Sequence, residues 1–288
     1  MSRVQVLLAA VCFGTTGTAQ ALGPDGLAPA AVGSARILVG GALLVLVALV
    51  MHGGRAITRV NRGPALAAAA GVAAYQLAFF AAVKDTGVAV GTIVAIGSGP
   101  MFAGAFEWAL DRRVPSRGWA LATALAIAGV TMLAGGGAEV SPAGVTLALV
   151  AGASYATYTI SAKRMLHHGH APETVMAVAF GLGALLLAPV LASTGAGWLT
   201  HADGLGLAVF LGVVPTALAY LLFAHGLKRL TAAETATLTL AEPLTAALLG
   251  VLVLSERLSA PAAIGAALVL AGLLVLAAPE RRRRLAWQ

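Results

Sequence analysis

Long apolar segments separated by short polar loops follow one another along the whole chain. Ten of these segments approach the roughly 20 mostly apolar residues that a helix needs to cross a lipid bilayer. The predicted spans are about residues 4–22, 28–51, 64–83, 86–107, 118–136, 142–162, 173–194, 204–226, 231–254 and 260–278. The pattern predicts an all-α membrane protein with ten transmembrane helices, whose short loops leave no room for a soluble catalytic domain.

The composition also indicates that lipid surrounds most of the protein. Hydrophobic residues make up 59% of the chain and charged residues 10%, with a mean hydropathy of +0.92. Soluble domains carry about 25% charged residues, so most of this surface must face lipid rather than water. The single cysteine, Cys12, excludes an intramolecular disulfide framework.

Basic residues are distributed unevenly between the two predicted sides of the membrane. With the N-terminus placed in the cytoplasm, most of the 18 Lys and Arg residues fall on the cytoplasmic side. Only Lys84 and Arg257 fall outside, and Arg36 lies within a span. By the positive-inside rule, both termini are predicted to be cytoplasmic. The net charge of +7 therefore reports topology, and we expect no nucleic-acid partner.

The second half of the chain repeats the first, and the two halves divide near the glycine run at 135–137. The predicted repeats are residues 1–138 and 139–288. Four pairs share one constant spacing, which we term the repeat offset: Pro29 and Pro172, Gly40 and Gly183, Pro100 and Pro243, and Gly129 and Gly272. Because each half has five spans, an odd number, the second half should enter the membrane from the opposite side. Inverted repeats of this kind are typical of secondary transporters, although channels also use them.

Sequence motifs of enzymes and ATP-driven proteins are absent. The chain has no Walker, HExxH or GxSxG motif, which predicts neither catalysis, nor ATP use, nor a cofactor. His167, His168 and His170 fall in a predicted cytoplasmic loop beside basic residues, a pattern that favours a solvated loop over a metal site.

Two ionisable residues, Arg36 and Glu242, lie deep within predicted spans. Such a group costs roughly 2.5 to 3.5 kcal/mol at mid-helix on insertion scales, so each needs a role. Their predicted depths differ by about 6 Å, which allows an ion pair. Arg36 would otherwise snorkel or bond free carbonyls. Glu242 would attract a substrate ammonium group, carry a coupling proton or brace a helix kink.

Pro100 and Pro243 lie at matching places in mid-span, and each proline leaves carbonyls of the preceding turn free. Paired interruptions of this kind point to a substrate site between the halves, and Ser98 adds a hydroxyl beside Pro100. The alternative is that both prolines only shape the bundle.

Aromatic residues within the spans suggest the character of that site. Tyr75 and Phe79 share one helix face, as do Tyr155 and Tyr158, with Thr159 adjacent. A cavity lined by these rings would suit amphipathic amino acids. Further candidates for the lining are Thr15, Thr16, Gln20 and Gln76.

Several motifs are similar to a known family. The run Leu240-Ala241-Glu242-Pro243, the later Leu254-Ser255-Glu256-Arg257 and the Ala271-Gly272 pair resemble the EamA repeat of the drug/metabolite transporter superfamily. The first span, with Phe13-Gly14-Thr15-Thr16, resembles the YddG-type amino-acid exporters, which often have Trp where this chain has Phe13.

This resemblance implies a bacterial inner-membrane carrier with ten helices and a central cavity. The small-molecule substrates it implies are aromatic and other neutral amino acids, exported by alternating access. A nucleotide-sugar or drug carrier is the alternative, although only Arg36 offers a basic group to a phosphate. A channel is the alternative of another class.

Overall fold

A computed structural model describes residues 1–112, 114–133, 141–255 and 259–277 of the chain. The regular structure of these residues is entirely helical. In chain order the α-helices are α1 (Ser2–Ala21), α2 (Pro29–His52), α3 (Gly54–Thr58), α4 (Arg62–Asp111), α5 (Arg117–Leu133), α6 (Pro142–His167), α7 (Pro172–Thr194), α8 (Ala202–Gly212), α9 (Ala219–Leu227), α10 (Ala232–Leu238), α11 (Ala241–Leu254) and α12 (Ala260–Ala277). A short 3₁₀ helix, Gly197–Thr200, precedes α8, and a π-helical turn, Val213–Leu218, joins α8 to α9.

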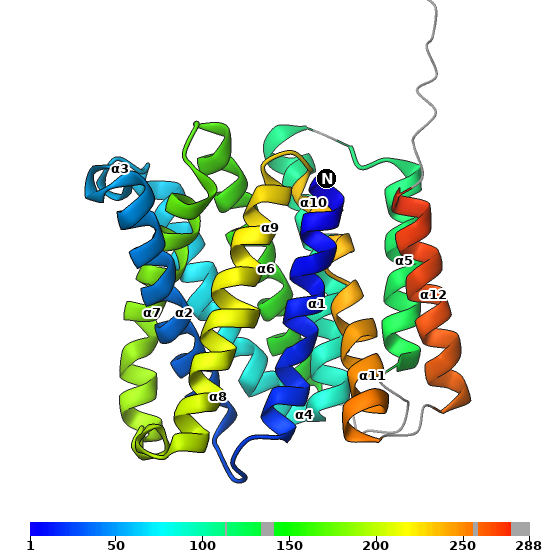
Figure 1. The fold of residues 1–288 in the computed structure, drawn as a ribbon. Helices are drawn as coiled ribbons and strands as arrows, with labels where there is room; N and C mark the ends of the chain where they lie inside the picture. Colours follow the sequence, from blue (N-terminus) through cyan, green and yellow to red (C-terminus); the bar gives the residue numbers. More distant parts are fainter. Residues whose placement is uncertain (113, 134–140, 256–258, 278–288) are drawn as a thin grey trace, which may run out of the picture.

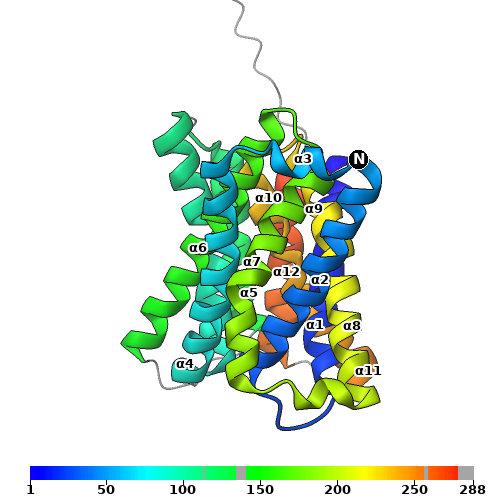
Figure 2. The same cartoon turned by 90° about the vertical axis from the view of Figure 1, so that its left-hand side faces the viewer.

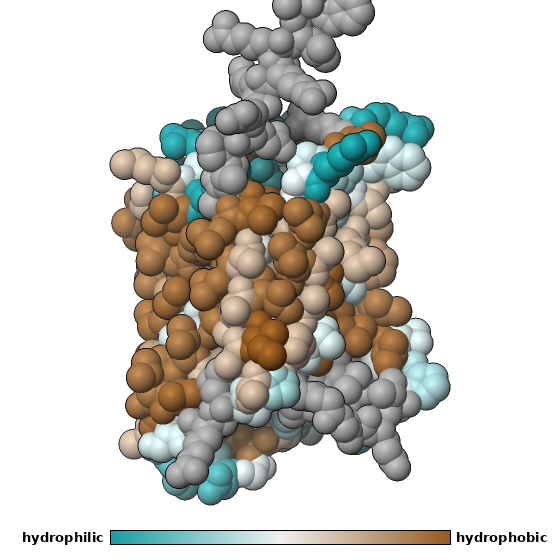
Figure 3. Space-filling model, turned by 90° about the vertical axis from the view of Figure 1, so that its right-hand side faces the viewer, coloured by the Kyte–Doolittle hydropathy of each residue, from teal (hydrophilic) through white to brown (hydrophobic). Residues whose placement is uncertain are grey.

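The long helices run side by side as one bundle, with the chain start and the end of α12 at the same end (Figures 1 and 2). In the described part of the chain, 8 helical segments are long and apolar enough to cross a membrane, and two shorter apolar helices are Arg117–Met132 and Ala260–Leu276. The face made by α5 and α12 carries a hydrophobic band between two hydrophilic ends (Figure 3). These features confirm the predicted all-α membrane class.

Helix α4 contains both the third and the fourth predicted spans and folds back on itself between them. A Cβ atom on Gly91 would lie 3.1 Å from the backbone nitrogen of Val83. In a straight helix, residues eight apart are separated by about 12 Å, so the chain must reverse between these two residues. Ala82 and Ala95 then meet in one apolar cluster across the two arms.

The second half has two interruptions within predicted spans. Between α8 and α9 the π-helical turn contains Pro215, and Thr216 donates to the Leu211 carbonyl at 2.8 Å. Helix α10 ends at Leu238 and α11 begins at Ala241, so the predicted span 231–254 is made of two helices. Pro243 lies in the first turn of α11, where helical N–H groups need no intrahelical acceptor.

The glycines that recur at the repeat offset make equivalent contacts. A Cβ on Gly129 of α5 would lie 2.5 Å from the carbonyl oxygen of Gly265 in α12. A Cβ on Gly272 of α12 would lie 2.6 Å from the carbonyl oxygen of Ala122 in α5. Ala122 and Gly265 are themselves separated by the repeat offset. The same close backbone contact is therefore made twice, with the two helices antiparallel.

A second glycine pair behaves similarly, though less tightly in one copy. A Cβ on Gly40 of α2 would lie 2.8 Å from the carbonyl oxygen of Gly212, and one on Gly183 of α7 would lie 3.7 Å from that of Ala69. Ala69 and Gly212 also correspond through the repeat offset. Close approach of this kind holds helices together in lipid, where no hydrophobic drive acts between them.

Candidate functional site

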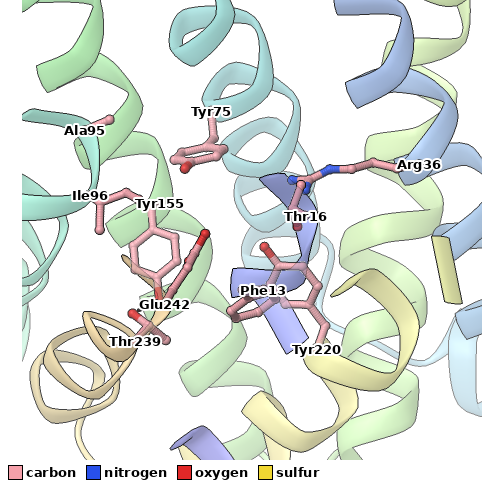
Figure 4. A pocket seen from close by; sticks show the side chains of 10 residues that line it. All are labelled: Phe13, Thr16, Arg36, Tyr75, Ala95, Ile96, Tyr155, Tyr220, Thr239 and Glu242. Carbon is pink, nitrogen blue, oxygen red and sulfur yellow. Dashed lines mark hydrogen bonds between the residues drawn. The ribbon is translucent and has the colours of Figure 1, made fainter. Parts of the chain in front are cut away.

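A small cavity lies at mid-depth, where helices of both halves meet (Figure 4). Its volume is about 50 Å³, room for a few water molecules. The lining residues come from α1, α2, α4, α6, α9 and the α10–α11 segment. They are Phe13, Thr16, Arg36, Tyr75, Ala95, Ile96, Tyr155, Tyr220, Thr239 and Glu242.

Arg36 extends from α2 into this cavity and is held there by one neutral side chain. Its Nη2 donates to Gln76 Oε1 at 3.3 Å, and Gln76 Nε2 donates in turn to the Gly33 carbonyl at 3.1 Å. Gln76 is buried, and the Nε of Arg36 is also buried but has no hydrogen-bond partner. A buried donor without an acceptor is costly, so the guanidinium is left with unused capacity to bind an acceptor.

Glu242 enters the cavity from the other side, in the first turn of α11 just after the helix break (Figure 4). The Glu242 N–H donates to the Thr239 carbonyl at 2.9 Å, which fixes the turn that presents the carboxylate. The ion pair between Arg36 and Glu242 that the sequence allows is not among the ion pairs of the described residues. The cavity therefore contains a guanidinium and a carboxyl group that form no ion pair with each other in this structure.

Aromatic rings form much of the wall around these two charges. The ring centroids of Phe13 and Tyr220 are 4.9 Å apart, and those of Tyr75 and Tyr155 are 6.3 Å apart. The Tyr155 hydroxyl shares a hydrogen bond of 3.3 Å with Thr239 Oγ1, which ties α6 to the helix break.

A smaller hollow beside the cavity shares four lining residues with it and also reaches Gln76 and Tyr158. Tyr158 is buried, and its hydroxyl donates to the sulfur of Met176 at 3.3 Å. Of the residues predicted for the site, the structure thus brings together Arg36, Tyr75, Gln76, Tyr155, Tyr158 and Glu242, with Thr16.

The other predicted residues lie outside the lining of both spaces. They are Thr15, Gln20, Phe79, Ser98, Pro100, Thr159 and Pro243. Thr15 donates to the Cys12 carbonyl at 2.7 Å, exposed Gln20 donates within its own helix, and Phe79 stacks on Tyr75 with centroids 5.6 Å apart. These side chains serve helix geometry or packing in this conformation.

Phe13, Tyr220 and Thr239 line the cavity but were not among the predicted site residues. A signal existed for Tyr220, because Ala219-Tyr220 in the second half resembles Ala74-Tyr75 in the first, although this pair departs from the repeat offset by two residues. Thr239 had no comparable signal, since its place depends on the helix break.

At one end of the bundle, two charged side chains hold the connection between α9 and α10; we term Glu107 and Lys163 the polar latch. Lys163 Nζ donates to the carbonyls of Leu227 and Leu230 at 2.7 and 2.6 Å, and to that of Lys228 at 3.3 Å. The Glu107 carboxylate accepts the N–H groups of Ala232 and Ala233 at 2.6 and 3.1 Å. The latch thus satisfies the free carbonyls at the end of α9 and the free N–H groups at the start of α10.

Further polar contacts join helices at the same end. Glu173 of α7 lies between two histidines, 3.0 Å from His52 Nε2 and 3.3 Å from His225 Nε2. Arg3 lies 3.6 Å from Glu234, and Arg164 lies 3.9 Å from Asp111. This end of the bundle is therefore tied by polar contacts between α1, α2, α4, α6, α7, α9 and α10.

The chain is similar over nearly its full length to bacterial transporters. It is 43% identical over 285 residues to an uncharacterized transporter, YwfM, of Bacillus subtilis (strain 168), covering 98% of this chain and 95% of the relative. It is 26% identical over 294 residues to an uncharacterized inner membrane transporter, YicL, of Salmonella typhimurium, covering 97% of this chain and 96% of the relative.

Structural and family comparisons agree with these relatives. A solved crystal structure matches with a TM-score of 0.83 and 20% identity, covering 96% of both chains, which shows a shared fold. The sequence model of the EamA-like transporter family matches residues 3–135 and again residues 142–278, one match on each side of the glycine run. The chain belongs to the EamA-like transporter family.

Proposed function

We propose that this protein is a secondary transporter that exports aromatic and other neutral amino acids across the bacterial inner membrane by alternating access. The observation that carries the proposal is the cavity in which Arg36 and Glu242 enter from opposite sides without forming an ion pair (Figure 4).

A zwitterionic amino acid would satisfy both charges at once. The guanidinium of Arg36 offers an unused buried donor to a carboxylate, and charge-assisted bonds of this kind are about twice as strong as neutral ones. The carboxylate of Glu242 would receive the ammonium group. A substrate with only one of these groups would leave a charge of the protein buried and uncompensated, which is costly.

In a conformation more open than the one described, whose cavity of about 50 Å³ has room for only a few water molecules, the aromatic wall would accept the substrate side chain. Phe13, Tyr75, Tyr155 and Tyr220 present ring surfaces to the cavity, and paired rings favour stacked or edge-on contact with an aromatic or aliphatic group. A phosphate-bearing substrate fits less well, because Arg36 is the only basic side chain of this lining.

The bundle supports the transport cycle. We propose ten membrane crossings in two inverted repeats, residues 1–138 and 139–288. The reciprocal contacts of Gly129 and Gly272 support this arrangement, because antiparallel helices that exchange the same contact are what a twofold axis in the membrane plane produces. Exchange of conformation between the halves would expose the cavity to each side in turn.

The proposed orientation of the protein in the membrane rests on the distribution of its basic residues. The described basic residues, apart from Arg36 and Lys84, lie at the end of the bundle that carries the chain start and α3 (Figure 1). By the positive-inside rule, this end is the cytoplasmic one. Both termini are then cytoplasmic.

Counterflow in proteoliposomes tests the proposal, with three ligands of one shape: phenylalanine, phenethylamine without the carboxylate, and 3-phenylpropionate without the ammonium group. We expect phenylalanine to be preferred. Arg36→Gln should lower phenylalanine transport roughly tenfold or more and narrow its advantage over phenethylamine. Glu242→Gln should narrow its advantage over 3-phenylpropionate. Arg117→Gln and Asp203→Asn remove the same charges at exposed positions and serve as matched controls.

Two results would contradict the proposal. Rapid uptake without counterflow would indicate a channel. Unchanged ligand preference in both cavity variants would place recognition elsewhere in the protein.

A further inference from the structure

A second hollow, larger than the central cavity, lies on the outside of the bundle between α2, α3, α4 and α7. It has a volume of about 650 Å³ and is lined almost entirely by apolar side chains. We term it the α2–α7 groove. Figure 2 views the bundle from the side on which α2, α3 and α7 lie, with α3 above them at one end.

The groove has the depth of one membrane leaflet. Along α7 its lining runs from Ala177 to Ala188, which at 1.5 Å per residue is roughly 16 Å. The hydrocarbon core of a bilayer is roughly 30 Å thick, so the groove covers about half of it. It begins at the end of the bundle that carries α3, because Thr58 and Arg62 line it there.

Small side chains on two helices hollow out this surface. Ala42 on α2 and Gly181, Ala184 and Ala188 on α7 all line the groove. A Cβ on Gly181 would lie 2.7 Å from Val45 Cγ2, so the helices approach closely beneath the groove. A long apolar groove of this shape matches a flexible hydrocarbon chain, which gains dispersion contacts along its whole length.

Unpaired positive charge surrounds the end of the groove. Arg62 is part of the lining, and Arg59 lies between two lining residues, Thr58 and Val60. Arg55, Arg59 and Arg62 are exposed, and none forms an ion pair with a described residue. The side chain of Asn61 does not cap the first turn of α4, so N–H groups there are also free to donate.

From these observations we propose that the α2–α7 groove binds one anionic phospholipid. One acyl chain lies along α7, and the phosphate binds Arg59 and Arg62 at the start of α4. The site is separate from the central cavity and does not depend on the proposed transport function. It would link α2, which carries Arg36, to α4 and α7 through a bound lipid.

The proposal is tested with the purified full-length protein in a neutral detergent. Phosphatidylglycerol and phosphatidylcholine with identical acyl chains are titrated, and bound lipid is counted by native mass spectrometry while thermal stability is followed. We expect phosphatidylglycerol to bind more tightly and to raise the unfolding temperature more. Arg59→Gln with Arg62→Gln should weaken phosphatidylglycerol binding roughly tenfold or more.

Two further variants separate charge from shape. Arg117→Gln with Arg229→Gln removes the same charge from exposed positions at the same end of the bundle, and binding should be unchanged. Ala42→Phe fills the groove from an exposed position and should weaken the binding of both lipids.

Four outcomes would overturn the proposal. Equal binding of the two lipids, or equal loss in both double arginine variants, would mean that no specific headgroup site exists. Full competition by glycerol phosphate would indicate a site for free phosphate. A dimer that Ala42→Phe dissociates would mean that a second copy of the chain covers the groove.

Discussion

The two halves of the chain differ most clearly at their matching prolines. Pro100 lies inside α4, which continues through it, whereas Pro243 follows a break between α10 and α11. At the break, the Thr239 carbonyl is taken by the N–H of Glu242, three residues on, instead of by residue 243, whose proline has no N–H. The same residue at the same place thus gives two different backbones.

The two halves make the same contacts where glycines pack against backbone, but they carry different residues at the cavity. Gly129 and Gly272 make one contact twice, but the counterpart of Glu242 in the first repeat is Gly99. A shared scaffold therefore supports an asymmetric site. If so, substitutions at Gly129 and Gly272 should have equal effects on stability, and those at site or latch pairs should have unequal ones.

The largest effect is expected at the glycine pair. Gly129→Ala and Gly272→Ala each place a Cβ against a backbone carbonyl, at 2.5 and 2.6 Å, and backbone atoms cannot turn away. Each should lower stability by about 3 kcal/mol, measured by unfolding of the purified protein in detergent. Gly206→Ala, which meets no atom within 4 Å, is the control. A clear difference in stability between the two glycine variants would mean that the two halves do not share this contact.

The next effect concerns Lys163 and Gln20, its counterpart in the first repeat. Lys163→Met leaves three carbonyls without their charged donor and should cost about 2 kcal/mol. Gln20→Met removes one exposed bond within a helix and should change the unfolding temperature little. Equal losses of stability in the two variants would mean that the polar latch contributes no more than an ordinary exposed hydrogen bond.

A smaller loss is expected for Glu107→Gln. The glutamine oxygen can accept one of the two N–H bonds, while its amide nitrogen cannot accept the other. We expect a loss of about 1 kcal/mol in the same unfolding measurement. Asp111→Asn, which removes only an exposed ion pair of 3.9 Å, is the control and should fall within about 0.5 kcal/mol of the unchanged protein.

The smallest stability effects are expected at the prolines, and transport distinguishes them. Pro100→Ala restores an N–H to a helix that is already continuous and should change stability by less than about 1 kcal/mol, with transport unchanged. Pro243→Ala provides an N–H for the Thr239 carbonyl and should favour joining of α10 to α11, which moves Glu242 and lowers transport. Counterflow rates measured side by side test this, and equal rates would argue against a role for the break.

Much of the fold was readable from the sequence because lipid imposes simple rules. Apolar length predicted the helices, and the motifs around Glu242 predicted the family, which the family match confirms. The reversal of α4 lies close to the predicted boundary between the third and fourth spans, which end at residue 83 and begin at residue 86. An interruption at Pro243 was predicted, but its form was not: α10 ends at Leu238 and α11 begins at Ala241. One proline does not determine whether a helix bends or divides, because that depends on which carbonyls the nearby N–H groups reach.

Within the candidate cavity, the charged residues had the clearest signal in the sequence, because burying a charge is costly. Arg36 and Glu242 were predicted because charges within a span need a reason. Neighbouring neutral residues were harder to separate: Thr16 lines the cavity while Thr15 bonds to its own helix. In a soluble helix, the apolar stripe marks the inner face. Here lipid-facing and inward-facing surfaces are both apolar, so the rotation of each helix about its axis was not determined.

The polar latch has a consequence for water. Separating α9 and α10 from Glu107 and Lys163 would leave three carbonyls and two N–H groups without partners, and lipid can supply none. Opening this end of the bundle must therefore admit water molecules that replace the lost bonds. We expect the opening rate to fall when osmolytes too large to enter lower the water activity, and hydration of this connection would then be a step of the proposed transport cycle.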